Sequence, residues 1–166
     1  RGFSGVQNFP TVGLIDEDSS FRQNLEETGM GYDKEVEMIR EAADQGMLTC
    51  PYVFTEQQAR EMTEAGADVI VSHMGLTTSG DIGAETALDL EAAAERVQAH
   101  HDAAKDVNED VMVICHGGPI AWPDDAEYVL NNTEGVVGFF GASSIERLPT
   151  EEAIENQTRE FKELDL

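Results

Sequence analysis

Two histidines stand where predicted buried strands end. His73 and His116 each close an apolar run, over residues 67–72 and 111–115. The carboxyl ends of parallel strands meet at one rim of an α/β fold, and ligands bind there. An imidazole with a pKa near ~6.5 can exchange a proton with a substrate or bind an anionic group. We therefore predict catalytic roles for both histidines, although a hydrogen bond to a neighbouring loop would explain either one alone.

Polar or glycine-rich residues follow the other predicted strands in the same way. Glycines allow backbone N–H groups to approach an anion, and serine hydroxyls add further donors. The residues predicted to bind an anion in this way are Gly117, Gly118, Gly141, Ser143 and Ser144. Tight turns would also explain such glycines. The first two strands end in Gln7, Asn8 and Tyr52.

One arginine and the remaining titratable residues have less specific interpretations. Arg147 follows the last predicted strand and suits a carboxylate or phosphate, or an ion pair with Glu146 or Glu151. His100 and His101 lie in an acidic helical stretch, and we expect them to be solvated.

The sequence indicates metal binding only weakly. The two strand-end histidines could hold a divalent ion together with Asp16 or Glu27, but no HxH or HExxH spacing occurs. A GxSxG elbow, a GxGxxG after a strand and a P-loop are also missing from the sequence. Cys50 and Cys115 form no CxxC pair, so we expect two buried thiols in a reducing compartment.

Five predicted strand–helix repeats position these residues. The predicted strands cover residues 5–12, 48–54, 67–74, 111–116 and 136–141, and helical patterns follow each of them. A glycine-rich segment, residues 75–83, is expected to be a mobile loop over the rim. The third and fourth strands are nearly continuous β-branched runs, which predicts a parallel sheet covered by helices. Periodicity alone leaves a doubly wound five-stranded sheet and an arc of a barrel as alternatives.

The composition indicates the cellular environment of the protein and excludes some classes of partner. The 166 residues carry 34 acidic against 10 basic side chains, for a formal charge of −24. These acids are spread over helix faces instead of forming a tail, which favours a halophile's cytoplasm over an acidic interaction protein. Nucleic acid and membranes are not expected as partners, because a basic patch and an apolar run of ~18 residues are both missing. One domain over residues 1–166 is expected, and Arg1 suggests a fragment or a processed piece.

Seven motifs, in order, carry a resemblance to a known family. They are GVQNFPTVGLID, FRQNLEETGMGY, EVEMIR, PYVF, AGADVIVSHMGLT, VICHGGPI and GFFGASSIERLPTE. Together they resemble the phosphoenolpyruvate hydrolase-like family of TIM-barrel enzymes, which is grouped with the phosphoenolpyruvate/pyruvate-binding barrels. The resemblance implies the last five of eight βα units of a TIM barrel. Residues 17–20 depart from the family pattern and put only the local loop in doubt.

The resemblance also implies a function. We expect an enzyme, a hydrolase or lyase, that acts on a small phosphorylated carboxylate such as phosphoenolpyruvate. Gly117, Gly118, Ser143 and Ser144 would hold the phosphate, His116 or His73 would be the general acid or base, and Gln7, Asn8 and Tyr52 would orient the carboxylate. The wider superfamily implies Mg²⁺, but its acidic ligands are not evident here. A homo-oligomer is expected. The alternative is a non-catalytic barrel that senses a small molecule in signal transduction.

Overall fold

The strands of the computed structural model, which describes residues 2–85 and 88–165, are all parallel. They are β1 (Gly5–Val6), β2 (Leu48–Thr49), β3 (Tyr52–Val53), β4 (Val69–His73) and β5 (Met112–His116). β1 pairs with β2, and β3, β4 and β5 form a second sheet in that order. Neighbours in space are thus neighbours in the chain, as in an arc of a barrel, whereas a doubly wound sheet would reverse its strand order. The fold is mixed α/β with parallel strands.

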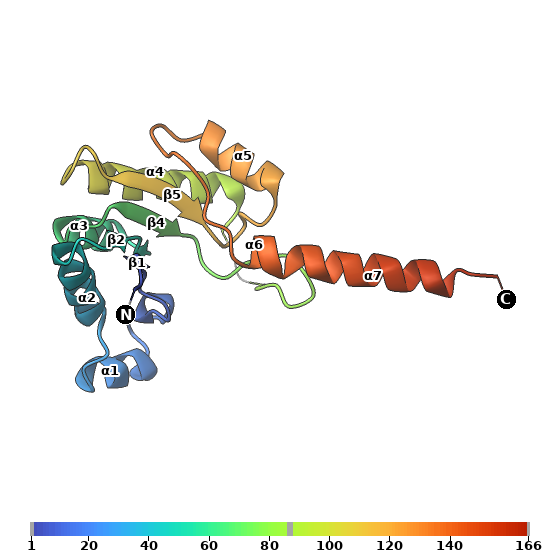
Figure 1. Ribbon diagram of the computed structural model, residues 1–166, viewed down its shortest axis with the longest axis horizontal. Coiled ribbons are helices and arrows are strands. Elements are labelled where there is room, and N and C mark those ends of the chain that lie inside the picture. Colours follow the sequence, from blue (N-terminus) through green and yellow to red (C-terminus); the bar gives the residue numbers. More distant parts are fainter. Residues whose placement is uncertain (1, 86–87, 166) are drawn as a thin grey trace.

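Helices connect and cover these strands (Figure 1). They are the 3-10 helix η1 (Val12–Leu14) and the α-helices α1 (Ser20–Glu27), α2 (Tyr32–Asp44), α3 (Glu56–Glu64), α4 (Leu90–Lys105), α5 (Pro123–Asn131), α6 (Ser143–Glu146) and α7 (Leu148–Lys162). Side chains of Ser19, Thr55 and Asp89 accept N–H bonds at the starts of α1, α3 and α4. These side-chain caps fix where the three helices begin.

The core lies between the sheet and the helices α2 to α5. Ile70 and Val113, paired across β4 and β5, are fully buried in one apolar cluster with Met62 of α3. Cys115 is buried in a second cluster with Val97 of α4. Because side chains alternate along a strand, the residues between these point to the other face of the sheet. His73 and His116 therefore lie on the face away from the helices.

Three predicted strands differ from the observed ones. The predicted strand 48–54 is two short strands, because Pro51 has no N–H to give to a ladder. The predicted strand 5–12 pairs regularly only over Gly5–Val6. The segment 136–141 was wrongly predicted as a regular strand: it has one isolated parallel bridge, from Phe139 to Cys115. Gly138 and Gly141, two of the six residues of this half-exposed edge, disfavour a regular strand.

The histidines of α4 are a second correction. His100 is 2% exposed and His101 is 9% exposed, so the prediction that both are solvated was wrong. His100 Nδ1 lies 2.8 Å from Ser72 Oγ on β4, so the ring of His100 points into the protein. The thiol of Cys115 is buried as expected, whereas Cys50 is half-buried.

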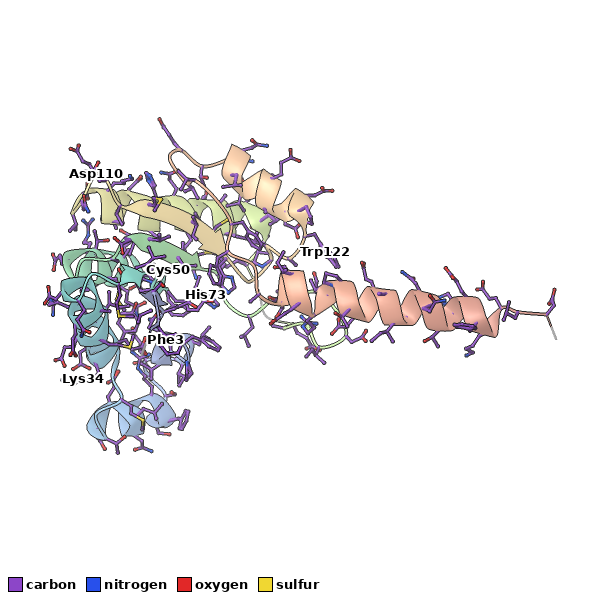
Figure 2. The ribbon with its side chains drawn as sticks, viewed as in Figure 1. Phe3, Lys34, Cys50, His73, Asp110 and Trp122 are labelled. Carbon is purple, nitrogen blue, oxygen red and sulfur yellow. The ribbon has the colours of Figure 1, made fainter. Side chains whose placement is uncertain are left out.

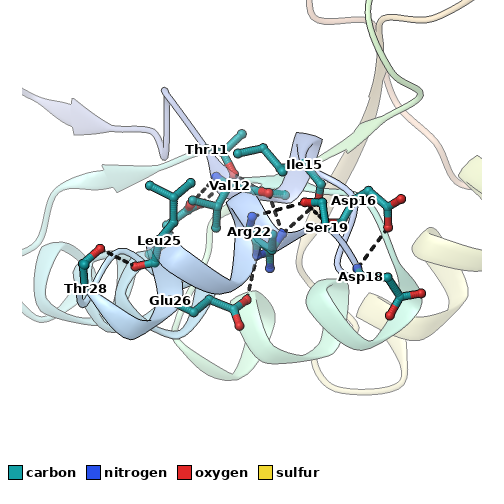
Figure 3. Close-up of polar contacts among 12 residues, drawn as sticks. Thr11, Val12, Ile15, Asp16, Asp18, Ser19, Arg22, Leu25, Glu26 and Thr28 are labelled. Atoms are coloured by element: carbon teal, nitrogen blue, oxygen red, sulfur yellow. Dashed lines mark hydrogen bonds and ion pairs between the residues drawn. The ribbon is translucent and has the colours of Figure 1, made fainter.

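The two ends of the chain hold less of the core. The guanidinium of Arg22, 4% exposed, joins α1 to η1 by donating to the carbonyls of Val12 and Ile15 and to Glu26 (Figure 3). α7 extends away from the body, and only Leu148 of this helix is buried (Figure 1). Within residues 2–85 and 88–165, no helix is both long and apolar enough to cross a membrane.

Candidate functional site

The two strand-end histidines meet as the sequence predicts. β4 and β5 pair in register so that His73 lies opposite His116, and their ring centroids are 4.5 Å apart with the ring planes at 81°. The ring of Tyr52, from β3, lies 4.9 Å from that of His73 and 5.0 Å from that of His116. Figure 2 shows His73 at the end of β4, where the strands lead toward α6. All three side chains are buried.

Each imidazole has one nitrogen bound to the backbone. The N–H of Gly75 donates to Nδ1 of His73 over 3.0 Å. Nδ1 of His116 lies 2.7 Å from the carbonyl oxygen of Phe140. Over the described residues, neither Nε2 atom has a hydrogen-bond partner in the protein. The two Nε2 atoms are therefore the ring nitrogens left for a ligand.

Burial keeps both imidazoles neutral near pH 7. Burial, and after it the charge of His116, lowers the pKa of His73 to about 3. Burial also lowers the pKa of His116, while the Phe140 carbonyl acts in the opposite direction. The pKa of the Tyr52 phenol is raised by burial and by Cys50, although the Gln7 side chain acts the other way. The site thus combines neutral hydrogen-bonding groups with aromatic walls.

Asn8 ties the end of β1 to β3. Its Oδ1 accepts the Tyr52 N–H at 2.7 Å, and its Nδ2 donates to Glu35 Oε2 at 2.6 Å and to the Tyr52 carbonyl at 3.3 Å. The Tyr32 hydroxyl donates to the same carbonyl at 2.7 Å. Asn8 is thus placed to fix the backbone of Tyr52, with both amide atoms already bound.

Sequence reasoning missed Glu35. This residue of α2 accepts from the Thr11 hydroxyl at 2.7 Å and the Val12 N–H at 2.8 Å, besides Asn8. One carboxylate therefore holds the whole turn that follows β1. The sequence signal was slight: Glu35 directly precedes the buried Val36 on an otherwise acidic helix.

Gln7, the residue before Asn8, contacts the segment that leads into Tyr52. Its Nε2 donates to the Cys50 carbonyl at 3.1 Å, and its side chain acts to lower the pKa of the Tyr52 phenol. Gln7 is half-buried, whereas Asn8 is 2% exposed. Gln7 is therefore the more exposed of these two neighbours.

The glycine pair after β5 packs against the His73 ring. Gly117 and Gly118 have φ angles of +75° and +59°, which favour glycine. A Cβ on Gly117 would lie 3.3 Å from His73 Cε1 and still closer to the Gly75 carbonyl. The Gly118 N–H donates to that carbonyl at 2.8 Å. These glycines allow a close approach between the two loops, and the Gly118 N–H is already used.

The serines predicted to be donors come shortly after Phe140, the backbone partner of His116. Gly141 is next to Phe140, whose carbonyl lies against His116, and Ser143 and Ser144 begin α6 directly after. Both serines are half-buried, and neither hydroxyl caps the helix. The two serines thus follow Phe140 in the chain by three and four residues.

Arg147 forms one of the two ion pairs that the sequence allowed. Its guanidinium donates to both carboxylate oxygens of Glu151, at 2.9 and 3.1 Å, and to the Ser79 carbonyl at 2.9 Å. The Asp81 N–H donates to the same carboxylate at 3.2 Å. Arg147 and Glu151 thereby hold the loop that follows β4 against the start of α7.

The residues at the mouth do not fit a Mg²⁺ site. Mg²⁺ takes oxygen ligands, mostly carboxylates and water, whereas the groups gathered here are imidazoles, a phenol and an amide. In the described part of the chain, no three His, Cys, Asp or Glu residues lie close enough together to hold a metal ion. Asp16 and Glu27 therefore do not join the two histidines in such a group.

Known proteins are similar in sequence to this chain. Residues 1–164 match the family described as Phosphoenolpyruvate hydrolase-like. The chain is 59% identical over 165 residues to the ToMV susceptible protein tm-1(GCR26) of Solanum lycopersicum, covering 99% of this chain and 22% of that protein. It is 58% identical over 165 residues to the ToMV resistance protein Tm-1(GCR237) of the same plant, with the same coverage. The chain thus spans about a fifth of the length of these relatives.

Solved structures resemble the chain more distantly. The N-acetylmannosamine-6-phosphate 2-epimerase from Clostridium perfringens has a TM-score of 0.46 and 16% identity, over 76% of this chain and 48% of that chain. FabK from Thermotoga maritima has a TM-score of 0.43 and 23% identity, over 63% of this chain and 29% of that chain. Likeness of this size does not bear on function.

Proposed function

Because the chain belongs to the phosphoenolpyruvate hydrolase-like family, we propose that it is part of an enzyme acting on a small phosphorylated carboxylate such as phosphoenolpyruvate. The observation that carries this proposal is the pair of neutral, buried histidines, each with a free Nε2, at the ends of two adjacent parallel strands. Neutral imidazoles in a partly dry mouth suit proton transfer at neutral pH. The arc of strands would then be the last five of eight βα units of a TIM barrel.

The proposed reaction is a hydrolysis. A water oxygen attacks phosphorus, the bond from phosphorus to the enol oxygen breaks, and a water proton passes to an imidazole. The released enolate takes up one proton, which gives pyruvate and inorganic phosphate. The Ser143 and Ser144 hydroxyls donate to the phosphate, and Gln7 and Tyr52 orient the carboxylate. Asn8 and Glu35 position Tyr52.

The setting of the enzyme is also part of the proposal. A net charge of −24 supports a salt-rich cytoplasm. The exposed apolar side chains of α7, among them Ile154 and Phe161, offer a surface for the expected homo-oligomer.

Phosphate release from phosphoenolpyruvate in molar KCl tests the proposal. The protein should release inorganic phosphate, and His116→Asn should lower the rate by ~100-fold or more, because this is the usual contribution of a general acid or base. Asparagine can still donate to the Phe140 carbonyl, so the loop contact is kept. His101→Asn, the same change at a buried histidine outside the site, is the matched control and should leave the rate within a few-fold.

Two other outcomes are informative. Binding of phosphoenolpyruvate without phosphate release would favour the non-catalytic sensor. Neither binding nor release, from this chain or from a longer protein that contains it, would end the proposal.

A further inference from the structure

We infer that His73 and His116 are held in opposite neutral tautomers, so that His116 alone can take up a proton at Nε2 while His73 can only donate from Nε2–H. This assignment rests on two backbone contacts and holds whatever the substrate is. The roles that it gives the histidines in catalysis rest on the proposed function. The assignment gives different roles to two histidines that look equivalent in the sequence.

The tautomer of His116 follows from its partner. A carbonyl oxygen only accepts hydrogen bonds, so the 2.7 Å contact with Phe140 requires a proton on Nδ1 of His116. A neutral imidazole has one ring proton, which leaves Nε2 with a free lone pair. A second proton can be added at Nε2 without disturbing the Phe140 contact.

The tautomer of His73 is the reverse. A backbone N–H only donates, so the 3.0 Å contact with Gly75 requires a bare Nδ1 on His73 and puts the ring proton on Nε2. A second proton would have to go to Nδ1, where it would face the Gly75 N–H. The imidazole of His73 therefore resists protonation through its geometry as well as its burial.

The backbone around Gly75 is fixed on both sides. The Met74 N–H donates to the His116 carbonyl at 2.8 Å, and the Gly75 carbonyl accepts from the Gly118 N–H at 2.8 Å. The peptide between Met74 and Gly75 thus lies between two bound neighbours. Turning its N–H away from His73 would disturb these contacts, so the donor is held in place.

The ligand chemistry follows from this polarity. One group should carry a proton that His116 can accept, such as the attacking water, and a neighbouring oxygen should accept from His73. In the proposed hydrolysis, the water proton passes to Nε2 of His116, whose Nδ1–H stays on Phe140, and the enol oxygen or the phosphoryl oxygen takes the His73 bond. His73 remains neutral throughout. The pair is not arranged to chelate a metal, because Nε2 of His73 carries a proton.

Long-range proton–nitrogen NMR on the unmodified protein labelled with ¹⁵N-histidine tests the tautomers at pH 7.5. We expect one ring with protonated Nδ1 and bare Nε2, and a second with the reverse pattern. Ring-to-ring proton contacts would identify the two, because their centroids lie 4.5 Å apart. His116→Asn should remove the signals of the first of these two rings and leave those of the other three histidines. The same tautomer for both rings, or two ring protons on either, would overturn the inference.

A kinetic comparison tests the roles. His73→Gln places an amide N–H near the lost Nε2–H and should retain turnover to within ~10-fold, whereas His116→Asn should lose ~100-fold or more. Equal losses in two folded variants would overturn the division of roles. If NMR finds the opposite tautomers but no substrate is bound or turned over, the proposed function fails and the assignment stands.

Discussion

Burial lowers the pKa of His73, His100 and His116. The pKa of His100 is lowered to about 4, mainly by burial and also by the charge of Arg96. His73 and His116 are lowered chiefly by burial as well. Three histidines therefore stay neutral in the folded protein at pH values where they would be charged in the unfolded chain.

This difference predicts acid sensitivity. A histidine with a lowered pKa contributes stability above its unfolded pKa of ~6.5 and loses that contribution as the pH falls toward its folded pKa. Each such histidine changes the free energy of unfolding by about 1.4 kcal/mol per pH unit in that window. Urea unfolding at pH 7.5, 6.5, 5.5 and 4.5 should show stability falling mainly below pH 6.5.

The matched variant is His100→Gln. It removes one titrating group and should make the pH dependence of the free energy of unfolding less steep, even if stability at pH 7.5 is lower. An unchanged slope would show that His100 is charged or exposed in the folded protein.

The environment of His100 was predictable in part. The buried stripe of α4 runs through Ala93, Val97 and Ala104, and His100 falls on it at helical spacing. Its acidic neighbours outweighed this signal. The meeting of His73 and His116 was predictable because parallel strands align their ends, whereas the contacts of Glu35 depend on a turn geometry that has no sequence pattern.

At the scale of elements, the sequence indicates long buried elements better than short or edge ones. The strands β4 and β5 and the helices α2 to α5 lie where their apolar patterns place them. Pro51 divides one predicted strand, and the glycines of segment 136–141 weaken another, because backbone pairing at an edge is not encoded by hydrophobicity alone. The amphipathic pattern of α7 correctly predicts a helix but does not reveal that its apolar side chains are exposed.

Because α7 extends away from the body, changes at its buried start and in its exposed remainder should affect stability very differently. At protein concentrations where sedimentation shows a monomer, deleting residues 152–166 should change the Tm by no more than about 2 °C, because exposed side chains contribute little to stability. Leu148→Ala should cost about 2–5 kcal/mol, since Leu148 is 1% exposed. Calorimetry measures both. A large fall in Tm on deletion, accompanied by a loss of oligomers in sedimentation, would show that α7 packs against another copy.

At the scale of the whole molecule, charge repulsion is the main long-range force. The formal charge is −24 over 166 residues, and ion pairs such as Arg147–Glu151 offset only part of it. Screening shortens the reach of this repulsion from ~10 Å at 0.1 M salt to ~3 Å at 1 M.

Salt should therefore stabilise the fold. The Tm should rise by several degrees between 0.1 and 1 M KCl as the self-repulsion is screened. Sucrose at equal osmolality is the control, because it acts by exclusion from the surface and does not screen charge. A Tm that is flat or falls in KCl would contradict the dominance of repulsion.

The contacts of the segment after β4 have a consequence for how ligands come and go. Its backbone is bound to Gly118 through the Thr78 N–H, and to Arg147 and Glu151 through Ser79 and Asp81. Hydrogen bonds at both places hold this segment against its neighbours. We therefore expect the rate at which small molecules reach and leave the histidine pair to depend on their size more than on movement of this segment.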